Sequence, residues 1–120
     1  MFEGKRILIL EDEPIIAFDL EDLLMAENAK VAVAGSVDGA FASLEKQTFD
    51  FAVLDVNLHG TKSYPFASRL VDEGVPFLFA TGYGDAEHPA EFAHVPTIMK
   101  PYRLSQIKDA ASRTLLGKRS

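Results

Sequence analysis

Five short apolar runs, separated by stretches with helical spacing, set the strictest limit on how this chain can fold. Each run is unbroken rather than alternating, which is the pattern of a strand whose two faces are both covered. The runs span residues 7–10, 31–34, 51–54, 76–80 and 96–99. Strands covered on both faces belong to parallel sheets with helices on either side, so the runs predict an α/β fold.

The stretches between the runs carry apolar residues at intervals of three and four, the spacing of amphipathic helices. These residues are Ile16, Leu20, Leu23 and Leu24; Val37, Ala40, Phe41 and Leu44; Ala67, Leu70 and Val71; and Leu104, Ile107, Ala111 and Leu115. Between Gly82 and Val95 the pattern is weakest, and we expect one short helix there. Strands that alternate with helices are joined by right-handed crossovers, which predicts a doubly wound (βα)5 domain with a parallel sheet.

Composition excludes several functional classes. The chain has 120 residues, 48% of them apolar, and we expect a single domain over residues 1–120. It contains no cysteine, which excludes thiolate nucleophiles and zinc–thiolate sites. Its formal net charge of −6 argues against nucleic acid as a partner. No apolar run could cross a membrane and no signal peptide precedes the first strand, so we expect a cytoplasmic protein without membrane contact.

Polar side chains follow four of the five predicted strands, at the points where those strands end. Glu11 and Asp12 follow the first run, Asp55 the third, Thr81 the fourth and Lys100 the fifth. Ligands of open α/β sheets bind outside the carboxyl ends of the strands. We therefore expect these side chains to converge on one crevice.

The convergence of carboxylates predicts a metal ion, because carboxylates only a few ångströms apart repel one another unless a cation lies between them. All the donors are oxygen atoms, which favours Mg²⁺, with Mn²⁺ or Ca²⁺ as substitutes in vitro. We expect Asp12 and Asp55 to be direct ligands and Glu11 to act through water. Asp55 can then attack phosphorus and form an aspartyl phosphate, whose charge Lys100 and Thr81 would stabilise.

This ordered set of residues resembles the receiver domains of two-component response regulators, over essentially the whole chain. The matching motifs are Glu11-Asp12, Asp55-Val56-Asn57, Thr81-Gly82 and Lys100-Pro101-Tyr102. The resemblance implies a flavodoxin-like fold with a five-stranded parallel sheet in the order 2-1-3-4-5. With no room for an output domain in residues 1–120, it implies a receiver domain alone.

The resemblance also assigns roles and partners. It implies that Asp55 is phosphorylated by a histidine kinase or a histidine phosphotransfer protein, with Thr81 and Lys100 assisting. The backbone carbonyl of Asn57 completes the metal site, and the bond before Pro101 is expected to be cis. Such a domain catalyses only its own phosphorylation and dephosphorylation, so we do not expect an enzyme. We expect a monomer or a weak phosphorylation-dependent dimer.

Residues 76–84 read PFLFATGYG and resemble the signature of the single-domain "FAT GUY" receivers. This narrower resemblance implies a role in bacterial stress or sensory phosphorelays, often with kinases of the HWE type. Without an output domain, the protein would signal by docking, as a relay intermediate or as a phosphate sink. Ile15 and Phe18, in the first predicted helix, are the expected apolar anchors for a partner.

Thr97 departs from the usual receiver pattern, in which a Tyr or Phe stands three residues before the lysine and acts as a switch. The aromatic-switch account of activation therefore does not transfer to this chain. Residues 82–95 contain two glycines and a proline. We expect them to be poorly ordered until a phosphoryl group engages Thr81.

Three alternatives can be weighed against the receiver. A phosphohydrolase of the haloacid dehalogenase group needs a general acid where Asn57 stands, and an amide cannot donate that proton. A flavin-binding domain needs a phosphate loop where the acidic residues 11–13 stand. A degenerate receiver would lack a reactive residue, whereas all the required residue types are present.

The remaining polar candidates have ordinary structural interpretations. His59, His88 and His94 lie in loop-like sequence, at a spacing that predicts neither a metal site nor a catalytic triad. Ser63 is expected to cap the helix that follows it.

Overall fold

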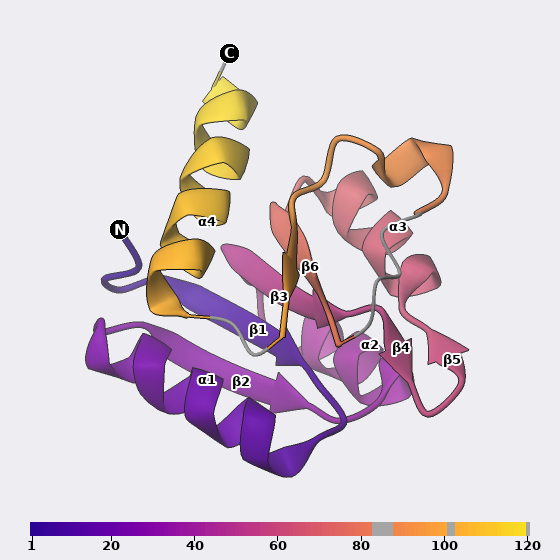
Figure 1. Cartoon of the computed structure of the whole chain (residues 1–120), viewed down its shortest axis with the longest axis horizontal. Helices are drawn as coiled ribbons and strands as arrows, with labels where there is room; N and C mark the ends of the chain where they lie inside the picture. The colour runs from indigo at the N-terminus through magenta and orange to yellow at the C-terminus, as the bar shows by residue number, and fades with distance from the viewer. Residues whose placement is uncertain (83–87, 101–102, 120) are drawn as a thin grey trace.

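The chain folds into a central sheet with helices on both faces (Figure 1). The computed structural model describes residues 1–82, 88–100 and 103–119, with side chains described as far as Arg113. The parallel strands are β1 (Arg6–Leu10), β2 (Lys30–Ala34), β3 (Phe51–Asp55), β6 (Phe77–Thr81) and β7 (Thr97–Met99). They lie in the order β2-β1-β3-β6-β7, which by sequence position is the predicted 2-1-3-4-5. The doubly wound α/β fold is therefore confirmed.

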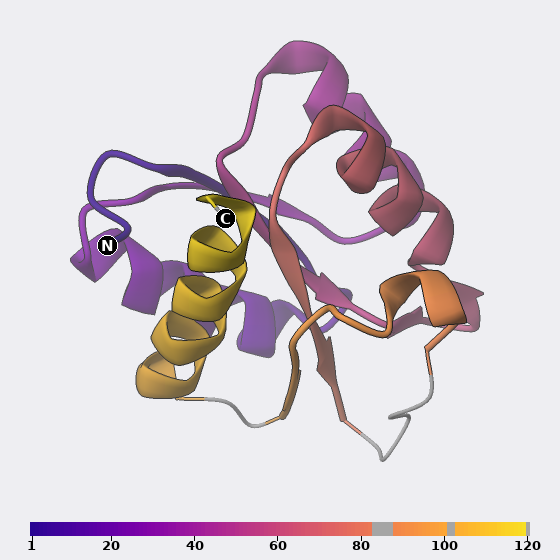
Figure 2. The same cartoon turned by 90° about the horizontal axis from the view of Figure 1, so that it is seen from above.

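The helices explain why the strands are unbroken apolar runs. Helices α1 (Pro14–Ala26) and α4 (Leu104–Arg119) cover one face of the sheet, and α2 (Val37–Lys46) and α3 (Tyr64–Glu73) cover the other (Figure 2). Successive strand residues point to opposite faces. Ile7 and Ile9 pack with residues of α1 and α4, whereas Leu8 and Leu10 pack with residues of α2 and α3. None of the helices in the described part of the chain has the length and apolar character needed to cross a membrane.

The crossover from β6 to β7 differs from the others. Among its described residues the helical part is a single 3-10 turn, η1 (Ala90–Phe92), where a short helix was predicted. Pro89 and Pro96 bracket this turn, and a proline prevents the preceding residues from continuing a helix. Phe92 is fully buried and stacks on Tyr64, with ring centroids 5.6 Å apart.

A small hairpin that the sequence did not predict follows β3. Strands β4 (Asn57–Leu58) and β5 (Thr61–Lys62) pair in antiparallel fashion. His59 and Gly60 form the two-residue turn with φ angles of 50° and 88°, as a type I′ turn requires. The usual signal for this turn is Asn-Gly or Asp-Gly, so His-Gly gave no indication of it.

Ser63 occupies the N-cap position of α3 as predicted, but its side chain makes no capping hydrogen bond. A capping side chain bonds the backbone N–H of the second or third helical residue. The second residue is Pro65, which has no N–H, and the Ser63 backbone (φ −84°, ψ 1°) is not in the extended conformation of a typical cap. The Ser63 hydroxyl is buried, and the described residues provide no hydrogen-bond partner for it.

Candidate functional site

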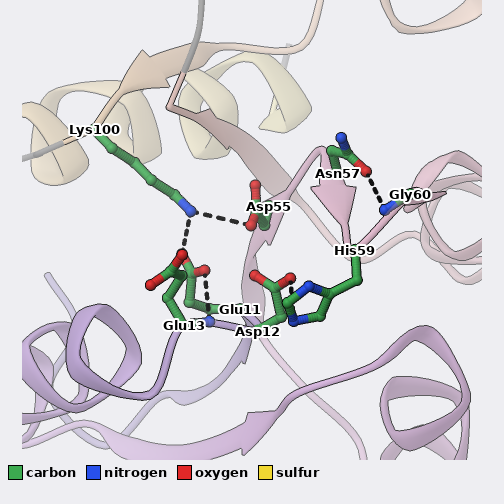
Figure 3. Close-up of polar contacts among 8 residues, drawn as sticks. All are labelled: Glu11, Asp12, Glu13, Asp55, Asn57, His59, Gly60 and Lys100. Atoms are coloured by element: carbon green, nitrogen blue, oxygen red, sulfur yellow. Dashed lines mark hydrogen bonds and ion pairs between the residues drawn. The ribbon is translucent and has the colours of Figure 1, made fainter.

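Three predicted carboxylates meet at the carboxyl edge of the sheet. Glu11 and Asp12 follow β1, and Asp55 is the last residue of β3. Leu10 pairs with Leu54 in the sheet, so the next residues of the two strands emerge side by side. One carboxylate oxygen from each of the three acidic residues lies within 4.8 Å of the others (Figure 3). The predicted acidic cluster is thus present in the structure.

Lys100 reaches this cluster from the end of β7 (Figure 3). Its Nζ lies 2.5 Å from Glu11 Oε1 and 3.0 Å from Asp55 Oδ2. The backbone fixes the starting point of the side chain, because Met99 pairs with Thr81 and the Lys100 N–H donates to the Thr81 carbonyl at 2.8 Å. Residues from β1, β3 and β7 are therefore in direct contact.

Burial makes the charges of this cluster costly. The side chains of Glu11, Asp55 and Lys100 are 2%, 8% and 11% exposed. Burial raises the pKa of Glu11 to about 7, although the hydrogen bond from Lys100 opposes the rise. For Lys100, burial alone would lower the pKa, but its bonds to Glu11 and Asp55 raise the pKa above its usual value. The lysine stays charged, and negative charge from the cluster remains uncompensated.

Asp12 contacts a residue that the sequence did not connect with the site. His59 Nε2 lies 3.1 Å from Asp12 Oδ2 (Figure 3). The contact depends on the positive φ of the hairpin turn, so nothing in the spacing of the sequence indicated it. The His59 side chain is 83% exposed, and polar contacts at such exposed positions add little stability. A cation that binds Asp12 could displace His59 at little cost.

Asn57 and Thr81 complete the predicted set. The Asn57 side chain accepts a hydrogen bond from the Gly60 N–H at 2.9 Å, so it is engaged in the hairpin and not with the carboxylates (Figure 3). Its proposed role therefore depends on its backbone carbonyl. Thr81 ends β6 and is buried. The predicted cis bond before Pro101, together with Tyr102, lies outside the described residues.

The fold and the site define a doubly wound α/β domain with an acidic cluster and a lysine at the carboxyl ends of its parallel strands. Residues 7–112 match the family described as "Response regulator receiver domain". The chain belongs to this family. The haloacid dehalogenase and flavin-binding alternatives are thereby set aside.

Two solved structures are among those similar to this chain. The solution structure of SdrG from Sphingomonas melonis Fr1 has 38% sequence identity and a TM-score of 0.83, over 96% of this chain and 99% of SdrG. The BeF3-activated conformation of SdrG from Pseudomonas melonis Fr1 has 39% identity and a TM-score of 0.78, over 97% and 99% of the two chains.

Curated proteins are similar over part of their length. The response regulator protein FleR of Pseudomonas aeruginosa is 23% identical over 117 residues, which are 93% of this chain and 25% of FleR. The sensory transduction protein LytT of Bacillus subtilis is 33% identical over 82 residues, 65% of this chain and 34% of LytT. The chain spans about a quarter to two fifths of the length of the curated relatives it matches.

The acidic cluster fits Mg²⁺, which receiver domains bind at an acidic pocket. Its donors are carboxylate oxygens, the ligands that hard divalent cations prefer. Glu11, Asp12 and Asp55 could hold such an ion beside Lys100. The ion would offset the mutual repulsion that burial intensifies.

The buried carboxyl of Glu11 should make the metal-free protein less stable as the pH rises. Its pKa is raised from 4.5 to about 7, so between these values the folded protein holds a proton that the unfolded chain has lost. Raising the pH across this range therefore favours unfolding. In chelator we expect Glu11 to lower the free energy of unfolding by up to about 3 kcal/mol, and Glu11→Gln to flatten the decline.

Urea denaturation at a series of pH values measures this effect. Glu45→Gln, at an exposed position of α2, is the matched control and should retain the wild-type slope. Mg²⁺ should stabilise the wild type more at pH 8 than at pH 5.5, because it binds the ionised carboxylate. An unchanged slope in Glu11→Gln would contradict the assignment of this cost to Glu11.

Proposed function

We propose that Asp55 accepts a phosphoryl group from a phosphohistidine of a histidine kinase or phosphotransfer protein. The observation that carries this proposal is the position of the Asp55 carboxylate, which contacts Lys100 Nζ and lies beside the carboxylates of Glu11 and Asp12. Such an arrangement can orient a carboxylate towards phosphorus and neutralise the charge that arrives with it.

The proposed reaction uses groups that are already in place. A carboxylate oxygen of Asp55 forms a bond to phosphorus as the bond from phosphorus to the histidine nitrogen breaks. Lys100 Nζ, 3.0 Å from Asp55 Oδ2, is placed to bind an oxygen of the incoming group. The Thr81 hydroxyl is the proposed second donor. The same phosphorylated residue would later lose its phosphoryl group to water.

The proposed metal ligands are Glu11, Asp12, Asp55 and the Asn57 backbone carbonyl. Mg²⁺ held there, or Mn²⁺ or Ca²⁺ in its place, would supply positive charge beside the phosphoryl oxygens. The side chains of this chain perform the rest: Asp55 attacks, and Lys100 and Thr81 stabilise the transferred group.

Incubation with acetyl phosphate and Mg²⁺, followed by intact mass spectrometry, tests the proposal. We expect one added phosphoryl group per chain, located by peptide mapping at Asp55, and no addition in the presence of chelator. Labelling at another residue, or no labelling with Mg²⁺ present, would overturn the proposed function.

The narrower assignment to the "FAT GUY" receivers is also a proposal. It is supported by residues 76–84 and by the 38% identity to SdrG over nearly the whole of both chains. On this assignment residues 1–120 form a receiver domain whose kinase is of the HWE type. The domain would signal by docking, as a relay intermediate or as a phosphate sink, as a monomer or a weak phosphorylation-dependent dimer.

Helix α1 offers the proposed docking surface for the phosphoryl donor. It begins directly after the acidic residues, and Ile15 and Phe18 are 77% and 65% exposed. We expect Ile15→Ala and Phe18→Ala to slow transfer from a phosphorylated histidine kinase about tenfold, because exposed apolar anchors supply much of a docking energy. Labelling by acetyl phosphate should not change, since that donor needs no docking.

Met25→Ala is the matched control for these variants. Met25 is 54% exposed but lies at the far end of α1 from the acidic cluster, so its replacement should leave both rates unchanged. Equal slowing with the kinase and with acetyl phosphate would show that Ile15 and Phe18 support the site itself, and would contradict the docking role.

A further inference from the structure

The two ring nitrogens of His88 make hydrogen bonds to two different elements, α3 and β7. Tyr64 Oη lies 2.8 Å from His88 Nδ1, and Thr97 Oγ1 lies 2.7 Å from His88 Nε2. The imidazole is half-buried and packs against Phe79, with ring centroids 4.4 Å apart. One side chain therefore joins the start of α3, the middle of β6 and the start of β7.

Each of these contacts lies on an element adjacent to the reactive site. Phe79 precedes Thr81 by two residues on β6, and Thr97 precedes Lys100 by three residues along β7. Phe79 and Thr97 are also paired in the sheet, so the imidazole spans the β6–β7 pair. Tyr64 begins the helix that follows the β4–β5 hairpin after Asp55. His88 thus connects β6, which ends at Thr81, with β7, which ends next to Lys100, and these are the two residues proposed to bind the phosphoryl oxygens.

Strand β7 is short, and its buried residue Ile98 packs with residues of α4. It is an edge strand of three residues, and in the described sheet it pairs with β6 alone. Thr97 presents its hydroxyl to His88, and the His88 ring packs on Phe79 of the neighbouring strand. The hydrogen bond between Thr97 and His88 therefore adds a side-chain constraint at the start of β7, beside its pairing with β6 and the packing of Ile98.

We propose that His88 is a positioning residue for phosphoryl transfer, holding β7 and its Lys100 in place against β6 and its Thr81. The inference rests on the proposed phosphorylation of Asp55. When Lys100 and Thr81 bind the oxygens of a phosphoryl group, the ends of β6 and β7 are drawn towards Asp55. Through Thr97 this displacement reaches the imidazole, so its two hydrogen bonds change as the site is occupied.

A pair of substitutions at Thr97 tests the positioning role. Thr97→Val removes the hydroxyl with little change of shape, whereas Thr97→Ser keeps it. We expect Thr97→Val and His88→Phe to slow labelling of Asp55 by acetyl phosphate about threefold to tenfold, the effect of one lost hydrogen bond on a transition state. Thr97→Ser should label at nearly the wild-type rate. His94→Phe, at an exposed histidine, is the matched control.

Imidazole nitrogen NMR provides a readout that a purely structural role would not move. On addition of beryllofluoride and Mg²⁺ to the wild type, we expect the Nδ1 and Nε2 resonances of His88 to shift and those of His94 to stay. Unchanged His88 resonances, or Thr97→Val labelling as fast as Thr97→Ser, would overturn the role of His88. Failure of the wild type to be labelled at Asp55 would instead overturn the proposed function.

Discussion

Asp55→Asn should lose its phosphoryl labelling by at least about a thousandfold, the scale of effect seen when an enzyme loses its nucleophile. An amide oxygen carries no negative charge and is a poor nucleophile, although the side chain keeps almost the same shape. The fold should survive, because the substitution removes one of several like charges from a buried cluster. It should also lower the pKa of Glu11 from about 7, since the charge of Asp55 contributes to raising that value.

Asp72→Asn is the matched control for this experiment. Asp72 is exposed on α3, away from the acidic cluster, so the variant should be labelled like the wild type. Intact mass and peptide mapping give both the extent and the position of labelling. Wild-type labelling of Asp55→Asn, or transfer of the label to Asp12, would contradict the assignment of Asp55 as the acceptor.

Lys100→Met should have the second largest effect, on both rate and stability. The lysine contacts Glu11 and Asp55 at once, and the variant leaves these buried carboxylates without their ammonium partner. We expect labelling by acetyl phosphate to slow at least about a hundredfold, because a preorganised charge beside the transferred group is lost. In chelator the free energy of unfolding should fall by about 3 kcal/mol, the usual cost of breaking a buried ion pair.

Metal ions separate the two effects of this substitution. Mg²⁺ should restore part of the lost stability of Lys100→Met, because it also brings positive charge to the carboxylates, but should not restore the rate. Lys46→Met, at the exposed end of α2, is the matched control and should change neither quantity. A wild-type rate in Lys100→Met would show that the lysine serves the fold alone.

The sheet and the acidic cluster could be predicted because both follow from local sequence. A strand covered on both faces must be apolar throughout, and Phe51–Asp55 shows that the first polar residue after such a run marks its carboxyl end. The topology of parallel strands then brings those ends to one edge. The positions of Asp12, Asp55 and Lys100 therefore required no knowledge of side-chain packing.

The parts that could not be predicted depend on contacts between distant residues. His59 reaches Asp12 only because a His-Gly turn adopts positive φ angles, and that dipeptide is not a usual signal for the turn. His88 and Thr97 are nine residues apart in the sequence. Their hydrogen bond depends on the packing of the His88 ring against β6, which spacing alone does not indicate. Ser63 does stand at the N-cap of α3, but Pro65 lacks one of the N–H groups that a capping hydroxyl would bind.

The 3-10 turn in the β6–β7 crossover buries less apolar surface than a full helix, which affects how much free energy its detachment from the core would cost. Within Ala90–Phe92 the buried side chain is Phe92, whereas detaching α3 would expose Phe66, Ala67 and Leu70 together. Releasing one aromatic ring costs roughly 2–3 kcal/mol, a fraction of the free energy of global unfolding. Opening of this turn should therefore cost less free energy than detaching α3, and it would leave the remainder of the core closed.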